Sequence, residues 1–249
     1  MGKRGKYVEA NRAAARWLDR FLPAELSRRV EPTRLVDGHL SCRLRVADVG
    51  GGKKPCLSAA DVGRLELDLI GMDIDAAELA RAPDGVYGEI RVIDLDIPEA
   101  APTADFDLVI CLNTLEHVGD ARVALNNLCR MLRPGGTLLV AAPCRHAVFA
   151  HLNRQLPERL KRRLLFGLFP GKRGDGFPAR YDRASPPEYT AILEEDGLEV
   201  VGVERIYWSS YFTLFFPLYA LWRAVSLLQR ALVPGYCERF IVIARRPAG

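Results

Sequence analysis

The sequence predicts an α/β fold in which helices cover both faces of a mainly parallel sheet, and three observations support this. Short apolar runs of strand length alternate with segments of helical periodicity along the chain. One run, Phe106–Leu112, is rich in Leu, Val and Ile, which is typical of a strand buried on both faces. Two acids, Asp48 and Asp73, each end an apolar run, and the first precedes a glycine turn. At 249 residues the chain can hold one such domain with insertions.

Seven short apolar runs are predicted strands. Turn-forming residues such as Gly, Pro and Asp separate them. In chain order they are Arg43–Val49, Leu65–Asp73, Glu89–Ile93, Phe106–Leu112, Thr137–Ala142, Leu198–Ile206 and Phe240–Ala244.

Segments with helical periodicity lie between most of these runs. The clearest is Asp120–Leu132, whose apolar residues share one side and which a Pro-Gly-Gly sequence ends. Ser185 begins a helix that runs to Asp196, with Pro186 at its first position and Glu188 completing a capping box. The other predicted helices are Tyr7–Val30, which Pro32 ends, Ser58–Arg64, Asp75–Arg81 and the amphipathic, basic segment Val148–Phe169.

The turn Gly50-Gly51-Gly52 is the most informative motif, and it follows the run that ends in Asp48. Glycines let the backbone approach a ligand closely, and the acid that ends the next apolar run, Asp73, is placed to accept hydrogen bonds from a ribose diol. The motif therefore predicts a nucleoside site. Pro55 stands where the dinucleotide pattern requires its third glycine, so the turn is not built for a pyrophosphate.

Composition and the N-terminal residues predict the compartment of the protein and the surfaces it can contact. The formal net charge is a modest +4, and the six cysteines form no C-x-x-C pair, which indicates reduced thiols in a cytoplasmic protein. No apolar segment follows the basic N-terminus, so no secretory signal is expected, and Lys6 stands where a myristoylation motif requires Ser or Thr. Basic clusters form either a solvated face or a contact with anionic lipid or nucleic acid. They comprise Lys3, Arg4, Lys6, Arg159, Lys161, Arg162, Arg163, Lys172 and Arg173.

Five motifs follow one another in the chain: Asp48-Val49-Gly50-Gly51-Gly52, Gly71-Met72-Asp73-Ile74-Asp75, Phe106-Asp107-Leu108-Val109, Leu115-Glu116-His117-Val118 and Leu132-Arg133-Pro134-Gly135-Gly136-Thr137-Leu138. As an ordered set they resemble the class I S-adenosylmethionine-dependent methyltransferases, over roughly residues 43–205 and the last strand. The resemblance implies a Rossmann-like, three-layer α/β/α fold. Its seven-stranded, mostly parallel sheet would have an antiparallel last strand between its neighbours.

The resemblance also implies S-adenosyl-L-methionine as the cofactor, bound across the carboxyl ends of the first strands. By resemblance, Asp48 lies near the ammonium group and Asp73 holds the ribose hydroxyls. Asp94 hydrogen-bonds the adenine amine, unless it only caps a turn beside Asp96. The implied cofactor-binding residues are Asp48, Gly50, Gly51, Gly52, Asp73, Ile74, Asp94, Leu95, Leu112 and Asn113.

His117 is the leading candidate for the base that removes a proton from the methyl acceptor, because it follows the fourth strand and histidine titrates near neutral pH. Its alternative role is to cap a helix or bond a carbonyl. His146 is the second catalytic candidate, with His151 beside it. The related quinone-biosynthesis O-methyltransferases carry Glu-x-x-Glu-His at this place, whereas this chain has Asn113 for the first Glu. A hard cation prefers carboxylate oxygens, so no metal is predicted.

An uncharged apolar segment between the last two strands departs from a minimal methyltransferase. It is too short to span a bilayer and contains Pro217. From Phe212 to Val233, the apolar residues are expected on one face and Arg223, Ser226 and Arg230 on the other. Two interpretations stay open: an interface helix or lipid-substrate lid, which with Arg159–Arg173 forms a membrane-facing surface, or a dimer contact or core helix.

The sequence thus predicts an N-terminal helical cap over residues 1–42 and a methyltransferase domain over residues 43–249. This domain carries a substrate-side insert at 145–184 and an apolar helical insert at 207–236. The predicted function is O-methylation of an amphipathic small molecule, either a quinone or aromatic precursor, a lipid, or a lipid-linked sugar. The protein is predicted to be cytoplasmic, with a peripheral contact on the inner face of the membrane and a homodimer as further expectations. The alternatives are an RNA or protein methyltransferase, although no nucleic acid is expected, and a non-catalytic scaffold of the same fold.

Overall fold

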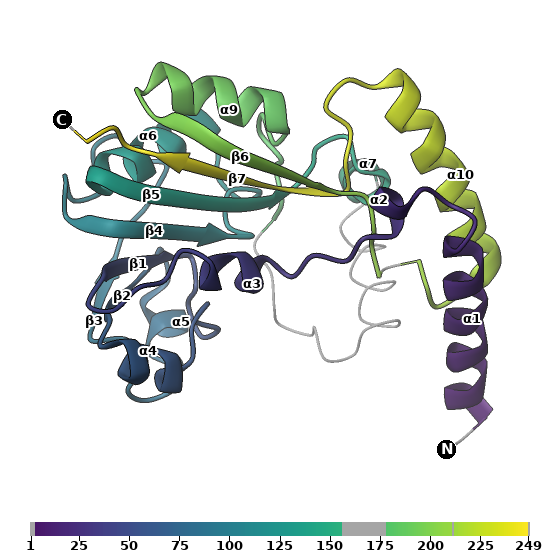
Figure 1. The fold of residues 1–249 in the computed structure, drawn as a ribbon, viewed down its shortest axis with the longest axis horizontal. Coiled ribbons are helices and arrows are strands. Elements are labelled where there is room, and N and C mark those ends of the chain that lie inside the picture. The colour runs from purple at the N-terminus through teal and green to yellow at the C-terminus, as the bar shows by residue number, and fades with distance from the viewer. Residues whose placement is uncertain (1–2, 156–177, 211, 249) are drawn as a thin grey trace.

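The computed structural model describes residues 3–155, 178–210 and 212–248, and its core is a seven-stranded sheet (Figure 1). The strand order is β3-β2-β1-β4-β5-β7-β6. β1 to β5 pair in parallel, and β7 lies antiparallel between β5 and β6. This topology confirms the predicted fold class. The strands are β1 Arg45–Val49, β2 Asp68–Asp73, β3 Glu89–Val92, β4 Phe106–Leu112, β5 Leu132–Pro143, β6 Glu199–Ile206 and β7 Arg239–Arg245.

Helices cover both faces of the sheet, and each face has its own apolar core. One core joins the sheet to α6 and α9, and the other joins it to α3 and α4. The described helices are α1 Lys3–Asp19, α2 Ala24–Ser27, α3 Pro32–Asp37, α4 Ala59–Leu65, α5 Ala76–Leu79, α6 Ala121–Met131, α7 Val148–Gln155, α9 Pro186–Glu195 and α10 Phe216–Leu232.

Side-chain caps fix several helix starts. Ser58 accepts a hydrogen bond from the Asp61 N–H at the start of α4, and Asp75 accepts one from the Ala77 N–H at the start of α5. At α9 the predicted capping box is wrong in its geometry. The Ser185 hydroxyl donates to the Glu188 carboxylate at 2.6 Å and caps no backbone N–H.

The N-terminal segment differs from the prediction of one helix ended by Pro32. α1 ends at Asp19, before Pro23, and Pro32 occupies the first turn of α3 instead of ending a helix. Proline lacks an N–H and has a fixed φ, so it favours the first turn, where no intrahelical partner is needed. Of the predicted helix Val148–Phe169, α7 accounts for the first part, and residues 156–169 lie outside the described residues.

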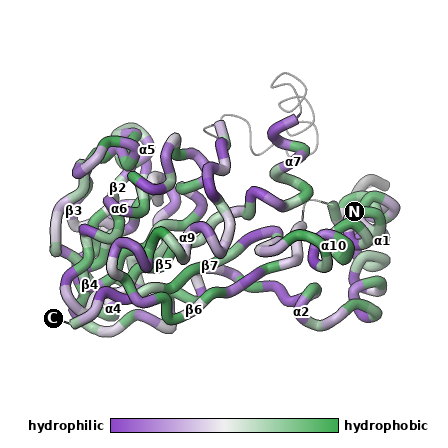
Figure 2. The backbone as a smooth tube through the Cα atoms, turned by 90° about the horizontal axis from the view of Figure 1, so that it is seen from above, coloured by the Kyte–Doolittle hydropathy of each residue, from purple (hydrophilic) through white to green (hydrophobic). Residues whose placement is uncertain are grey.

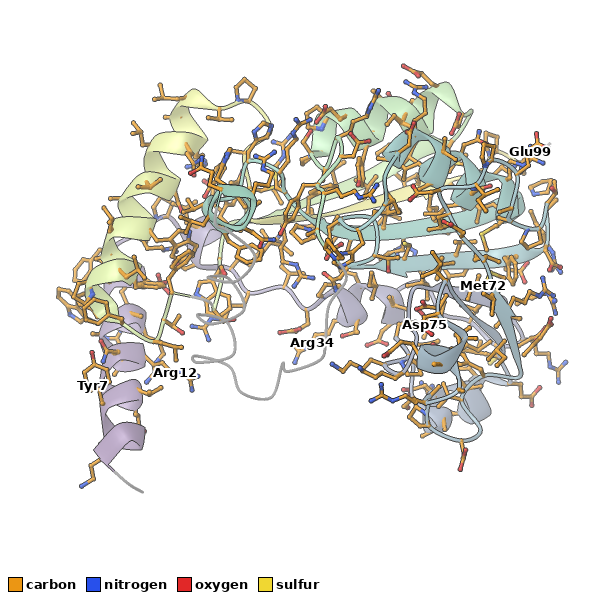
Figure 3. The ribbon with its side chains drawn as sticks, turned by 180° about the vertical axis from the view of Figure 1, so that it is seen from behind. Tyr7, Arg12, Arg34, Met72, Asp75 and Glu99 are labelled. Carbon is orange, nitrogen blue, oxygen red and sulfur yellow. The ribbon has the colours of Figure 1, made fainter. Side chains whose placement is uncertain are left out.

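The apolar insert between β6 and β7 folds as α10, and α10 packs on α1 beyond the end of the sheet (Figures 1 and 2). A third apolar cluster joins the two helices through Ala15, Phe212, Tyr219 and Trp222. Figure 3 shows Tyr7 and Arg12 on α1 at one end of the molecule, far from Met72 and Asp75 in the sheet domain. In the described part of the chain, no helix is both long and apolar enough to cross a bilayer.

Candidate active site

Glycine geometry fixes the conformation of the turn after β1. Gly50 has φ +77°, and its N–H donates to the Met72 carbonyl at 2.6 Å. A Cβ at Gly50 would lie 1.9 Å from Thr114 Oγ1, so a side chain there would collide with the segment after β4. Gly52 also has a positive φ, +49°. The turn therefore requires glycine both for its conformation and for its close packing on Thr114.

Asp48 lies beneath this turn and supports it. Its side chain is 2% exposed, and its Oδ2 accepts hydrogen bonds from the Cys56 N–H at 2.8 Å and the Tyr87 hydroxyl at 2.9 Å. Burial raises the pKa of Asp48, although both hydrogen bonds act to lower it. Asp48 does not line the cavity at the carboxyl ends of the strands, so its contact with the cofactor ammonium group stays a prediction.

Tyr87 is the residue that sequence reasoning missed. Its ring fills the space over Gly71, where a Cβ would lie 2.6 Å from the ring carbons. A glycine inside a buried strand was the available signal, because it marks a close approach by another group. The partner itself lies 39 residues from Asp48 in the chain, and only the fold brings the two together.

A cavity of about 380 Å³ opens at the carboxyl ends of β1, β2, β3 and β4, where parallel α/β sheets bind ligands. It lies at the topological switch between β1 and β4. Its lining residues are Val49, Gly50, Asp73, Ile74, Ile93, Asp94, Leu95, Asp96, Asn113, Thr114, His117, Val118, Pro178 and Arg180.

Asp73 lies at the end of β2, on the wall of this cavity. Its Oδ1 accepts the Asp75 N–H at 3.0 Å, and Oδ2 lies 3.0 Å from where a Cβ of Gly52 would stand. Burial raises the pKa of Asp73. A half-buried carboxylate beside a glycine turn has acceptor capacity for a diol, which fits the ribose role predicted for it.

The loop after β3 separates the roles of two neighbouring acids. Asp96 accepts hydrogen bonds from the N–H groups of Gly119 and Asp120, so it holds the start of α6. Asp94 accepts the Asp96 N–H at 2.9 Å and also lines the cavity. Asp96 lines the cavity as well, but its carboxylate already accepts from two backbone N–H groups, so Asp94 keeps more acceptor capacity for an adenine amine. Asn127 fixes this loop by donating to the carbonyl of the buried Leu95 at 3.0 Å.

The segment after β4 forms one end of the cavity wall. Asn113 has φ +57°, its N–H donates to the Ala141 carbonyl at 2.8 Å, and its Oδ1 accepts a hydrogen bond from Arg239. Leu112 does not line the cavity and packs against the core on the α3 and α4 side. This hydrogen bond places the positive charge of Arg239 beside Asn113, the residue that stands in place of the first Glu of the quinone-biosynthesis motif.

His117 lies on the cavity wall with a defined tautomer. Its Nδ1 is 3.2 Å from the Pro178 carbonyl oxygen. Because a carbonyl only accepts hydrogen bonds, Nδ1 carries the proton and Nε2 carries the lone pair in the neutral ring. Nε2 is 4.0 Å from Glu116 Oε1.

Glu116 is a second titratable group at this end. It is 7% exposed, and its Oε2 has no hydrogen-bond partner among the described residues. Burial raises the pKa of Glu116 to about 7, which the Arg239 charge only partly opposes. Its backbone carbonyl accepts from the N–H groups of Arg180 and Tyr181, and this joins the cavity wall to the segment after residue 177.

The two histidines predicted after the fifth strand, His146 and His151, lie outside the cavity wall. The carbonyl of His146 accepts from Gln229 at 3.2 Å, and burial lowers the pKa of His146. Burial also lowers the pKa of His151, whose Nδ1 lies 3.1 Å from Arg154. The cavity lining includes neither histidine. Tyr181 is buried and accepts from Asn153 at 3.0 Å.

The fold and this cavity define an α/β protein that binds a nucleoside-type cofactor at the switch point of its sheet. Residues 7–203 match the methyltransferase domain family. The chain belongs to the S-adenosylmethionine-dependent methyltransferases, and S-adenosylmethionine is its cofactor. The glycine turn, Asp73 and Asp94 fit that cofactor, because they offer close backbone approach at one end and carboxylate acceptors at the sugar and base.

Two relatives that are named as O-methyltransferases support the assignment of this chain to the family. A ubiquinone biosynthesis O-methyltransferase from Xanthomonas axonopodis pv. citri (strain 306) is 30% identical over 198 residues, 76% of this chain and 78% of that protein. One from Xanthomonas oryzae pv. oryzae (strain PXO99A) is 33% identical over 136 residues. That second match covers 51% of this chain and only 56% of the relative's own length.

Solved structures share the fold at low sequence identity. An S-adenosylmethionine-dependent methyltransferase from Mesorhizobium loti has a TM-score of 0.56 at 18% identity, over 86% of this chain and 96% of that one. The [4+2]-cyclase SpnF has a TM-score of 0.55 at 20% identity, over 87% and 81% of the two chains. Because a cyclase shares the fold, the fold alone does not set the acceptor chemistry.

Proposed function

We propose that this chain transfers the methyl group of S-adenosylmethionine to a hydroxyl oxygen of an amphipathic small molecule. A quinone or aromatic precursor is the favoured acceptor class, with a lipid or lipid-linked sugar as the other candidates. The observation that carries the proposal is His117 on the cavity wall, with Nδ1 held by the Pro178 carbonyl and a lone pair on Nε2. The relatives named as ubiquinone biosynthesis O-methyltransferases support an oxygen acceptor.

The chemistry divides between cofactor and protein. When bound, S-adenosylmethionine supplies a methyl group on a positively charged sulfur, already activated for displacement. The protein has to align the acceptor oxygen and remove its proton. His117 Nε2 takes that proton, and the hydrogen bond from Nδ1 to the Pro178 carbonyl orients the ring and stabilises the charged imidazolium that forms.

The remaining residues hold the cofactor in place. Asp73 accepts hydrogen bonds from the ribose hydroxyls, and Asp94 accepts one from the adenine amine. Gly50 lets the backbone approach, and Thr114, which packs on it, links the cofactor turn to the acceptor end. We further propose that the enzyme works in the cytoplasm at the inner face of the membrane, where an amphipathic acceptor is concentrated.

Substitution of His117 tests the base role. His117→Ala is expected to lower kcat for a catechol-type acceptor by about 10²-fold or more, because general-base catalysis has this magnitude. The affinity for S-adenosylhomocysteine, measured by calorimetry, is expected to be unchanged. His151→Ala is the matched control, since His151 is off the cavity wall. Full activity in the His117 variant would overturn the base role. Cofactor binding without turnover of any hydroxylated aromatic or lipid acceptor would overturn the proposed acceptor class.

A further inference from the structure

α10 turns its most apolar side away from the protein. Four leucines along one side of the helix are 44–68% exposed, and they recur at the spacing of a single helical stripe. Of the polar residues expected on the opposite face, Arg223 and Ser226 are buried, whereas Arg230 is exposed. The outer stripe, named here the leucine stripe, consists of Leu218, Leu221, Leu228 and Leu232.

Buried polar contacts fix this orientation. Arg223 is 2% exposed and forms an ion pair of 3.1 Å with Asp19 of α1. Its guanidinium also donates to the carbonyls of Leu26 at 2.7 Å and Tyr207 at 3.1 Å. Rotating α10 to bury the leucine stripe would expose or break these contacts, and a buried charge without its partner is strongly unfavourable. The leucine stripe is therefore held outward.

α1 and the turn that follows it add exposed aromatic and basic side chains beside α10. Trp17 and Phe21 are 54% and 69% exposed, and their rings pack edge to face at 5.0 Å. Figures 1 and 2 show α1 and α10 side by side, projecting beyond the sheet. Exposed basic residues accompany the aromatic rings: Lys6, Arg12, Arg16 and Arg20.

We propose that the leucine stripe of α10, with Trp17 of α1 and Phe21 just after it, docks this enzyme on the surface of an anionic lipid bilayer. Charge complementarity favours lipid over a second copy of the chain. A two-fold dimer brings identical patches together, so it would gather the α1 cations of both copies. Anionic headgroups neutralise those cations instead, while leucine and tryptophan side chains enter the interfacial layer. The inference deepens the proposed function, since an amphipathic acceptor partitions into the same layer.

Vesicle flotation tests this surface without requiring turnover. The full chain is mixed with phosphatidylcholine vesicles, with or without phosphatidylglycerol. Wild type is expected to float with the anionic vesicles, and Leu221→Asp/Leu228→Asp to lose about tenfold or more in partition coefficient. Arg12→Glu/Arg16→Glu is expected to lose binding only to the anionic vesicles. Val201→Asp/Val203→Asp is the matched control, because these valines are exposed on the edge strand β6 and should float as wild type.

Three results would overturn the proposal. Wild type could stay unbound with both vesicle types, or the β6 control could lose as much binding as the leucine variant. Sedimentation velocity could also reveal a dimer that Leu221→Asp/Leu228→Asp dissociates, which would assign the surface to a second copy. Calorimetry with S-adenosylhomocysteine verifies that each variant is folded. If Leu221→Asp/Leu228→Asp does not fold, the single variant Leu232→Asp, at the end of α10, takes its place in the flotation experiment. Vesicle binding without any methyl transfer would overturn the proposed function and leave this inference standing.

Discussion

Arg223 of α10 and Asp19 of α1 form an ion pair of 3.1 Å, and their side chains are 2% and 11% exposed. The two residues lie 204 positions apart in the chain. The Tyr219 hydroxyl also donates to Asp19. This contact ties the N-terminal helix to the insert before β7, so the two segments form one helical unit beside the sheet.

Removing one partner of this ion pair should lower the free energy of unfolding more than replacing both partners with apolar residues. Arg223→Met is expected to lower the free energy of unfolding by about 3–5 kcal/mol, because it leaves the Asp19 charge without its partner. The double variant Arg223→Met/Asp19→Leu should recover a large part of that loss. Urea denaturation of the three proteins measures both effects. A double variant less stable than Arg223→Met alone would contradict the assignment of this pair.

Asp73 should control cofactor affinity. Asp73→Asn removes the charged acceptor for the ribose hydroxyls, and charge-assisted hydrogen bonds contribute about 1.5–3 kcal/mol. The dissociation constant for S-adenosylhomocysteine is therefore expected to rise by roughly 10- to 100-fold in titration calorimetry. Asp37→Asn, on the exposed end of α3, is the control and should bind as wild type. An unchanged affinity in Asp73→Asn would exclude the ribose role.

Tyr87 should contribute to stability and to cofactor binding together. Tyr87→Phe removes the hydroxyl that donates to the buried Asp48, which costs about 1–3 kcal/mol when an acceptor is left unsatisfied. Thermal unfolding should shift down by about 2–4 °C for each kcal/mol, and S-adenosylhomocysteine should bind more weakly because the glycine turn loosens. Tyr7→Phe provides the comparison, since Tyr7 is exposed on α1. Equal effects of the two substitutions would show that the Asp48 contact is dispensable.

Glu116 should make stability depend on pH near neutrality. Burial raises the pKa of Glu116 to about 7 from 4.5, so the folded chain binds its proton more tightly than the unfolded chain. The stabilisation from this proton is complete below about pH 4.5 and is lost as pH rises through 7. Over that interval, wild type should lose roughly 3 kcal/mol of unfolding free energy relative to Glu116→Gln.

Denaturant titrations of wild type and Glu116→Gln at several pH values measure this difference. Glu9→Gln, on the exposed surface of α1, should follow wild type at every pH. Parallel curves for wild type and Glu116→Gln would mean that Glu116 has an ordinary pKa in the folded chain.

Methyl transfer should not require a divalent cation. Asn113 replaces a carboxylate, and its Oδ1 already accepts a hydrogen bond from the Arg239 guanidinium, a poor environment for a second positive charge. Turnover in the presence of a chelator is expected to equal turnover without it. Activity that a chelator abolishes and magnesium restores would disprove this prediction.

Much of the fold could be read from local patterns. Phe106–Leu112 matches β4 at both ends, and Asp120 caps α6 where the sequence predicts the helix to begin. These elements depend on apolar periodicity and on residues next to one another in the chain, which a sequence displays directly. The N-terminal helix was extended too far, because Pro23 interrupts it, and Pro32 was read as a stop although it begins α3.

The candidate site was predictable where parallel strands end. Asp73, Asp94 and His117 come from three different strand ends, and they meet at one cavity because such ends share one edge of the sheet. The support beneath the cavity was not predictable. Asp48 depends on Tyr87, and Asn113 depends on Arg239, and neither partner is signalled by its neighbours in the sequence.

The sequence by itself determined the strand and helix pattern, the glycine turn and the acids that follow the strands, because these depend on short-range periodicity and backbone conformation. Only the tertiary structure decided which side of α10 faces the solvent. Amphipathic periodicity fixes two faces of a helix but not which one is buried. Here Arg223 is buried because it pairs with Asp19, which is distant in the chain, and a buried charge needs a partner. The leucines on the opposite side of the helix are therefore exposed.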